Sequence, residues 1–292
     1  MITIKVPATS ANLGPGFDTL GLALDSYLEL TIEQKSPNWF IKHAFGPHIP
    51  TDEQNLIVSS ALSIDANLPA HTLQVHSPIP LARGLGSSSS AIVAGIVLAH
   101  VLRNETVSRQ QVFQEAAAIE GHPDNVAPAV FGGLQLSSVT EEGRFSSTTL
   151  PFPEELIGLA LIPNYAVSTK KARAILPKKL RYKQVVQQGN ALARLIAACY
   201  TTDAGALRQL VEEDQIHEQY RARLCPALPK VRELEASMGI HGSYLSGAGP
   251  TIMTLATADE IKRLQAPLAE LQKDAIVQKM PISQQGYQII QQ

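Results

Sequence analysis

A glycine- and serine-rich segment ahead of an apolar helix constrains the fold of this chain more than any other feature. Residues 78–91 have the sequence PIPLARGLGSSSSA, and residues 87–102 are apolar on nearly all sides, as expected of a buried helix. Gly84 and Gly86 allow backbone amides to turn toward one point, and serines follow where a helix N-terminus favours an anion. An ordinary strand-to-helix turn needs only one capping residue. The segment therefore predicts a phosphate-binding loop.

Two further glycine-containing segments are similar in kind. Residues 7–18 (PATSANLGPGFD) are expected to form a loop directly after a first strand, with Asn12 and Asp18 as polar tips. Residues 243–251 (SYLSGAGPT) indicate a glycine turn between two strands. The chain contains neither a Walker-type Gly-x-x-x-x-Gly-Lys-Ser/Thr pattern nor the catalytic-loop signature of protein kinases. Taken alone, either of these two segments is equally well interpreted as an ordinary tight turn, and the functional interpretation depends on the three segments together.

The order of the expected elements favours an α+β fold in two domains. A length of 292 residues suggests two domains, and the Ser/Thr-rich residues before Pro151 and Pro153 place the boundary between 1–152 and 153–292. Helices and strands alternate without a regular βαβ rhythm, which disfavours a doubly wound sheet. We expect helices at 87–102, 108–121, 183–200, 205–220, 230–238 and 259–272, and strands at 2–6, 28–33, 39–41, 73–75, 133–136, 159–162, within 243–256, and at 275–280.

Composition excludes several classes of protein. A net charge of −2 argues against a general nucleic-acid binder, because non-specific binding depends on many cationic phosphate contacts. Cys199 and Cys225 are too few for a disulfide framework or a cysteine-rich zinc site, so we expect reduced thiols. The apolar run at 91–102 is too short to span a bilayer, and the N-terminus lacks the core of a signal peptide. These features predict a cytoplasmic protein without a membrane or nucleic-acid partner.

A basic run lies between Lys170 and Lys183. It has two interpretations: a solvated loop, or a source of positive potential where anionic ligands meet. Tyr182 is the only aromatic residue within it, which argues against stacking on single-stranded nucleic acid.

Together with three more segments, these motifs resemble those of the GHMP small-molecule kinases, and among them most closely the homoserine kinases. The additional segments are EGHPDNVAP at 120–128 followed by FGG at 131–133, VSTKKARAILP at 167–177, and HEQYR at 217–221. The order agrees along nearly the whole chain. The resemblance implies an N-terminal ATP-binding domain like the second domain of ribosomal protein S5 and a ferredoxin-like C-terminal domain.

The implied reaction is ATP-dependent phosphorylation of the hydroxyl of L-homoserine to O-phospho-L-homoserine, a step of threonine biosynthesis. Homodimers are common in this family, so the resemblance also allows a homodimer.

The resemblance also implies which residues bind the nucleotide and its metal. Mg²⁺ takes few protein oxygens, and Ser88 and Glu120 are the implied ligands, with Glu115 as an open alternative to Glu120. The residues implied to contact ATP are Pro80, Leu81, Ala82, Arg83, Gly84, Leu85, Gly86, Ser87, Ser88 and Ser89, with Asn55 on the adenine side.

The implied substrate contacts follow from the chemistry of an amino acid. A carboxylate calls for arginine, whose planar fork matches two oxygens, and Arg173 and Arg221 lie in matching segments. The further implied contacts to substrate are Asn12, Asp18, His122, Asn125 and Thr169. Asp124, Asn125 and Asp18 are the implied catalytic residues. Two routes stay open for the hydroxyl proton: Asp124 as a general base, or direct transfer to the γ-phosphate.

Two other functions compete with this hypothesis. The first is a GHMP kinase for another alcohol, either mevalonate-type or a sugar; the paired arginines Arg173 and Arg221 favour an amino-acid substrate instead. The second is a catalytically silent ligand sensor on the same fold. A silent protein would have lost the metal glutamate or the loop glycines, and this chain retains both.

Overall fold

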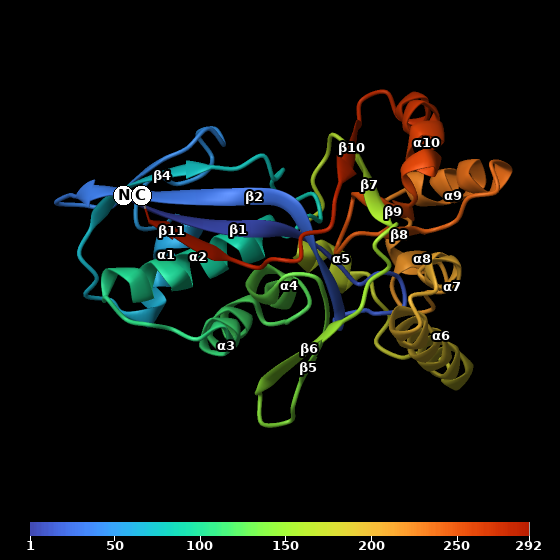
Figure 1. Cartoon of the computed structure of the whole chain (residues 1–292), viewed down its shortest axis with the longest axis horizontal. Helices are drawn as coiled ribbons and strands as arrows, with labels where there is room; N and C mark the ends of the chain where they lie inside the picture. The colour runs from blue at the N-terminus through green and yellow to red at the C-terminus, as the bar shows by residue number, and fades with distance from the viewer. Residues whose placement is uncertain (292) are drawn as a thin grey trace.

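Two β-sheets organise residues 1–291, the part of the chain that the computed structural model describes (Figure 1). In this part, the larger sheet has seven strands in the order β11-β1-β2-β4-β3, with β5 paired to β2 and β6 to β5. The smaller sheet has four strands in the order β10-β7-β9-β8. The strands are β1 (Ile2–Ala11), β2 (Leu20–Lys35), β3 (Phe40–Lys42), β4 (His71–His76), β5 (Leu134–Val139), β6 (Phe145–Leu150), β7 (Ile157–Ile162), β8 (Ser243–Leu245), β9 (Ile252–Ala256), β10 (Ile276–Met280) and β11 (Gln288–Gln291).

Helices cover one face of the larger sheet and pack beside the smaller one (Figure 1). In the first half these are α1 (Leu56–Ile64), α2 (Ser87–Leu102), α3 (Arg109–Glu120) and α4 (Val126–Phe131). In the second half they are α5 (Thr169–Ala174), α6 (Tyr182–Tyr200), α7 (Ala204–Leu210), α8 (Glu218–Arg221), α9 (Ala227–Ser237) and α10 (Ala258–Leu271). None of the helices in residues 1–291 combines the length and the apolar character needed to cross a membrane.

The helix at 87–102 is confirmed and forms the centre of the first layer. α2 contacts α1, α3 and β1, and its residues from Ser89 to His100 are buried apart from Ala91. The helix is apolar on all sides because other elements surround it on all sides. The expected cap of the next helix is also present: Ser108 accepts a hydrogen bond from the backbone N–H of Gln111, and Gly121 ends α3 with φ +84°.

The expected helix at 205–220 is wrong. α7 ends at Leu210 and α8 begins at Glu218, so residues 211–217 are irregular. Asp214 explains the break, because its carboxylate accepts backbone N–H groups of the following residues, His217 among them, that a continuous helix would use internally.

The segment after the first strand also differs from expectation. β1 continues to Ala11, so residues 7–11 are strand and the loop begins at Asn12. β1 pairs with β2 along this length, and the register shifts between Pro7 and Ala8, which pair with Tyr27 and Leu24.

The α+β architecture is confirmed, whereas the domain boundary at 152/153 stays a prediction. That boundary falls between β6 and β7, which lie in different sheets. β11 pairs with β1, however, so the last strand of the expected 153–292 domain belongs to the larger sheet.

Candidate active site

A cavity of about 420 Å³ lies where the three glycine-containing segments meet. Ser246 Oγ donates a hydrogen bond to the carbonyl of Gly84 at 2.6 Å, and the backbone N–H of Thr9 donates to the carbonyl of Leu85 at 3.2 Å. The side-chain amide of Asn12 donates to the carbonyl of Gly247 at 2.8 Å. Segments that are distant in sequence therefore form one wall of one site.

The loop before α2 leaves no room for side chains at its glycines. Gly84 and Gly86 have φ values of +80° and +70°. A Cβ on Gly84 would lie 2.3 Å from the carbonyl oxygen of Ser246, and one on Gly86 would lie 1.9 Å from Thr9 Oγ1. Gly86 is the N-cap residue of α2, and no side chain in residues 1–291 caps that helix. The backbone N–H groups at the start of α2 therefore remain for an anion in the cavity.

The structure separates the implied nucleotide contacts into two groups. The cavity is lined by Leu81, Ala82, Gly84, Gly86, Ser87, Ser88 and Ser89. Pro80, Arg83 and Leu85 are not among the lining residues. Leu85 is buried in the core, and the Arg83 guanidinium donates to the carbonyl of Pro163.

Glu120, rather than Glu115, faces the serines at the start of α2. Its carboxylate accepts hydrogen bonds from Ser88 Oγ and Ser89 Oγ, each at 3.2 Å. Burial raises the pKa of Glu120, although His122 and the two serine hydroxyls oppose the shift. Glu115 instead accepts from His100 Nε2 at 2.9 Å, outside the cavity. Residues 1–291 contain no group of three or more His, Cys, Asp or Glu side chains placed to hold a metal.

His122, Asp124 and Asn125 form one hydrogen-bonded unit between α3 and α4. His122 Nδ1 donates to Asp124 Oδ1 at 2.7 Å, and the same oxygen accepts the backbone N–H of Asn125 at 2.7 Å. Burial lowers the pKa of His122, but its hydrogen bond to Asp124 and the charges of Asp124 and Glu120 raise it above the usual value. Thr9 Oγ1 donates to Asn125 Oδ1 at 2.8 Å, which orients the amide.

Opposite charges lie together at the end of the cavity away from α1. Arg173 donates from Nη1 and Nη2 to the two carboxylate oxygens of Asp18, at 2.9 and 2.7 Å. Arg221 is buried, donates from Nε to the carbonyl of Ala172 and from Nη1 to that of Gly247, and lines the cavity. Burial and the nearby Arg173 charge lower the pKa of Arg221. Thr169, the first residue of α5, also lines the cavity.

Asn12 and Asn55, two of the implied ligand contacts, use their side-chain amides for hydrogen bonds within the protein. Asn12 is 2% exposed, and its Oδ1 accepts the backbone N–H of Asp18 while its amide binds Gly247. Asn55 caps α1: its Oδ1 accepts from the backbone N–H of Ile57, and its Nδ2 donates to the carbonyl of Pro50. Both side chains nevertheless line the cavity.

Sequence reasoning missed part of the lining. Phe17 faces the cavity, and its ring lies 5.7 Å from the guanidinium of Arg173 and 5.1 Å from that of Arg221. Its place in the segment GPGFD was a usable signal. The apolar lining at the other end had no motif to mark it, because its residues come from separate elements. It consists of Leu28, Phe45, Ile49, Pro50, Leu56, Ile57 and Val75.

An α+β chain with an anion cradle and a neighbouring pair of opposite charges has the features of a small-molecule kinase. Residues 55–133 match the family model of the GHMP kinases N terminal domain, and residues 195–274 match that of the GHMP kinases C terminal.

Curated proteins that are similar to this chain define the family further. A homoserine kinase of Lactiplantibacillus plantarum is 49% identical over 92% of this chain and 92% of its own. One of Leuconostoc mesenteroides is 43% identical over 93% and 92%. The crystal structure of homoserine kinase from Cytophaga hutchinsonii has a TM-score of 0.86 and 28% identity, covering 99% of this chain and 97% of that one. The chain belongs to the homoserine kinase family of the GHMP kinases.

Proposed function

We propose that this protein transfers the γ-phosphoryl group of ATP to the hydroxyl of L-homoserine, giving O-phospho-L-homoserine for threonine biosynthesis. The observation that carries the proposal is a single cavity with an anion cradle beside Asp18, Arg173 and Arg221. Homoserine carries a carboxylate, an ammonium group and a primary hydroxyl. The two arginines complement the carboxylate, and Asp18 complements the ammonium group. The similarity to homoserine kinases supports the same assignment.

ATP is proposed to lie along the cavity with its phosphates on the loop before α2. The backbone N–H groups at the start of α2 and the hydroxyls of Ser87, Ser88 and Ser89 supply hydrogen bonds to phosphate oxygens. The apolar residues between β2 and α1 supply a surface for the base, and Asn55 supports that surface by capping α1. Positioning of this kind provides most of the catalysis in phosphoryl transfer.

Ser88 and Glu120 are the residues proposed to hold Mg²⁺. The fit is chemical: a hydroxyl and a carboxylate lie 3.2 Å apart beside the cradle, and Mg²⁺ prefers one or two protein oxygens completed by phosphates and water. Bound there, Mg²⁺ would offset the negative charge of the phosphates. Burial raises the pKa of Glu120 although His122 Nε2 lies 4.0 Å from its carboxylate, and a bound cation would offset the remaining penalty.

Asn125 and Asp18 are proposed to orient the substrate hydroxyl, and Asp124 to hold His122 and Asn125 in place. Asp124 is 3% exposed, and its Oδ1 accepts hydrogen bonds from both neighbours. A loose transition state needs little help from a base, so the hydroxyl proton can pass directly to the γ-phosphate.

A coupled assay of ADP release tests the proposal. Purified protein with Mg-ATP is given L-homoserine, mevalonate or galactose in parallel, and the product is identified as O-phospho-L-homoserine. We expect turnover with L-homoserine above the other alcohols. Turnover with mevalonate or galactose alone would select a different GHMP kinase, and no ADP release with any alcohol would favour a silent sensor.

A further inference from the structure

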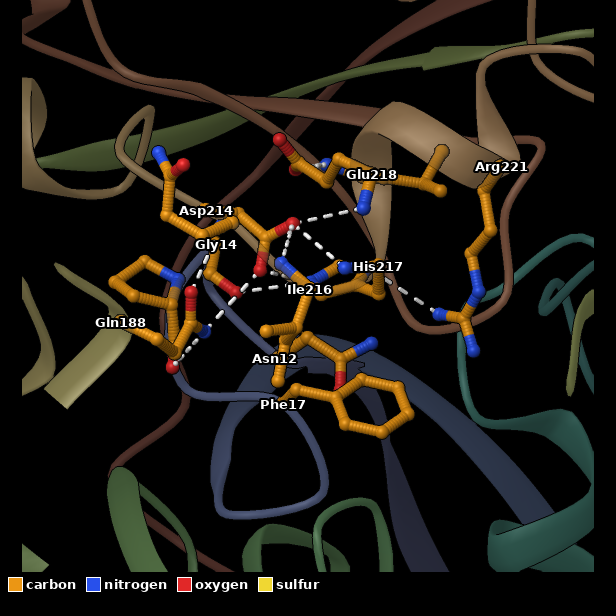
Figure 2. Close-up of polar contacts among 12 residues, drawn as sticks. Asn12, Gly14, Phe17, Gln188, Asp214, Ile216, His217, Glu218 and Arg221 are labelled. Atoms are coloured by element: carbon orange, nitrogen blue, oxygen red, sulfur yellow. Dashed lines mark hydrogen bonds and ion pairs between the residues drawn. The ribbon is translucent and has the colours of Figure 1, made fainter. Parts of the chain in front are cut away.

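A buried polar cluster lies behind the cavity, where the irregular segment between α7 and α8 meets the loop after β1 (Figure 2). Asp214 is its anchor, and its side chain has no exposed surface. Its Oδ2 accepts the backbone N–H groups of His217 and Glu218, each at 2.8 Å, and its Oδ1 accepts from Gln188 Nε2 at 3.2 Å. The position of His217 is therefore fixed by a buried carboxylate.

The hydrogen bonds of His217 define its tautomer. The ring is fully buried, and its Nε2 lies 2.9 Å from the carbonyl oxygen of Gly14. A carbonyl only accepts, so Nε2 carries a proton. Nδ1 lies 3.4 Å from Arg221 Nη1, and a guanidinium only donates, so Nδ1 is the acceptor. These contacts assign a neutral imidazole that donates to the loop and accepts from the arginine.

Asp214 Oδ1 also lies 3.5 Å from His217 Nε2, and the other two partners of the ring, Gly14 and Arg221, belong to the proposed homoserine site. Gly14 lies in the loop that carries Asp18, and a second hydrogen bond, from Gln188 Nε2 to the carbonyl of Pro15, holds the same loop. Arg221 is one of the two arginines proposed to bind the carboxylate. Phe17 closes the arrangement, because its ring stacks on His217 with centroids 5.1 Å apart and also lies 5.1 Å from the Arg221 guanidinium.

We propose that His217 is a positioning residue for the amino-acid substrate, because it joins Arg221 to the loop that carries Asp18. The inference rests on the proposed function. His217 itself is not among the residues that line the cavity, so it acts through Gly14 and Arg221. Loss of this link would leave the separation of Arg221 and the Asp18 loop to the remaining contacts through Gly247 and Asn12. Misplacement of a binding group by about 1 Å can cost on the order of 100-fold.

Steady-state kinetics of His217→Phe and His217→Gln test this role. Phe keeps an aromatic ring against Phe17 and removes both polar contacts, whereas Gln can still donate to the carbonyl of Gly14. We expect His217→Phe to raise the KM for L-homoserine by about 10- to 100-fold and to leave the KM for ATP unchanged. His217→Gln should recover much of that loss. His217→Asn, which lacks the reach to Gly14, serves in place of the Phe variant if that variant does not fold.

His100→Phe is the matched control, because His100 is also a buried histidine with two polar partners but lies outside the cavity. It should lower the melting temperature and leave both KM values unchanged. If His217→Phe changes only stability, or raises both KM values equally, His217 has a structural role and the inference is wrong. An inactive wild type would refute the proposed function as well, whereas an active wild type with an unaffected His217→Phe variant would refute this inference alone.

Discussion

Several charged side chains line the cavity, and each of them has a particular partner. Asp18 binds Arg173, Asp124 binds His122, and the hydroxyls of Ser88 and Ser89 bind Glu120. Asp124 is buried and Glu120 largely so, and charges removed from water need such partners because desolvation is costly, whereas Asp18 and Arg173 stay partly exposed. A zwitterionic substrate therefore has to compete with existing ion pairs, which favours ligands that bring both a carboxylate and an ammonium group.

Asp124→Asn separates the two routes for the hydroxyl proton. The amide of Asn can still accept from His122 and Asn125, so the shape of the site should be retained. We expect kcat to fall by about tenfold, less than the 100- to 10,000-fold range typical for loss of a general base. Single-turnover measurement of phosphoryl transfer decides the point. Near-normal turnover would exclude Asp124 as a general base, and a loss of about 1,000-fold or more would contradict direct transfer to the phosphate.

Glu120→Gln tests the proposed metal ligand against a neighbouring carboxylate. Gln keeps an acceptor for only one of the two serine hydroxyls, which bind different carboxylate oxygens, and it removes the charge, so kcat/KM should fall by about 100-fold and the Mg²⁺ concentration for half-maximal rate should rise. Glu115→Gln is the control, since Glu115 lies on the same helix and faces His100. Equal losses of kcat/KM in both variants would show that the substitutions act by disturbing α3 and not by weakening metal binding.

Glu235 is a buried carboxyl on α9, and its protonation should change the free energy of unfolding. It accepts a hydrogen bond from Thr254 Oγ1 at 2.6 Å, and burial raises its pKa to about 7. Because the folded state binds the proton more tightly than the unfolded state, stability should fall as pH rises from about 4.5 through 7.

Glu235→Gln removes that penalty and should stabilise the protein at pH 8.5, by about 3 kcal/mol at most, relative to its effect at pH 5. Urea unfolding of both proteins across this range is the measurement. A constant difference between them at all pH values would contradict a raised pKa at Glu235.

At the scale of elements, the loop before α2 is defined by close packing rather than by its glycines alone. Gly84→Ala introduces a Cβ against the carbonyl oxygen of Ser246, and Gly143→Ala meets open space although Gly143 has a similar φ of +76°. Both changes strain the backbone by about 1 kcal/mol. Only Gly84→Ala should raise the KM for ATP, by about tenfold or more, in the same steady-state assay. A similar rise in the KM for ATP with Gly143→Ala would show that the effect of Gly84→Ala does not come from close packing against Ser246.

The elements also show what sequence can and cannot predict. The helix α2 could be predicted because a helix that is apolar on all sides has to be buried. The helix α3 could be predicted because Ser108 and Gly121 mark its two ends. The break between α7 and α8 was not, because the helical pattern continues across it and a buried Asp214 carboxylate overrides that pattern. In the site, the motifs indicated which segments meet. The pairing of Asp18 with Arg173 depends on the fold of both halves and had no local signal.

At the scale of the whole molecule, the cavity depends on contacts that bind the two halves to each other. The loop after β1 is held by Gln188 and His217 from the second half, and β11 returns to pair with β1. The residues proposed to bind phosphate come from the first half of the chain, and both arginines come from the second. The near-zero net charge of the chain therefore conceals a site in which opposite charges are concentrated and matched to a small zwitterion.

The kcat/KM for L-homoserine, compared with two truncated alcohols, tests this account most directly. 3-Aminopropan-1-ol lacks the carboxylate, and 4-hydroxybutanoate lacks the ammonium group, while both keep the primary hydroxyl. Because each truncated alcohol brings only one of the two charges needed to replace the existing contacts of Asp18, Arg173 and Arg221, we predict that each truncation lowers kcat/KM by at least about 100-fold. Turnover of either truncated alcohol at a rate similar to that of L-homoserine would contradict the account.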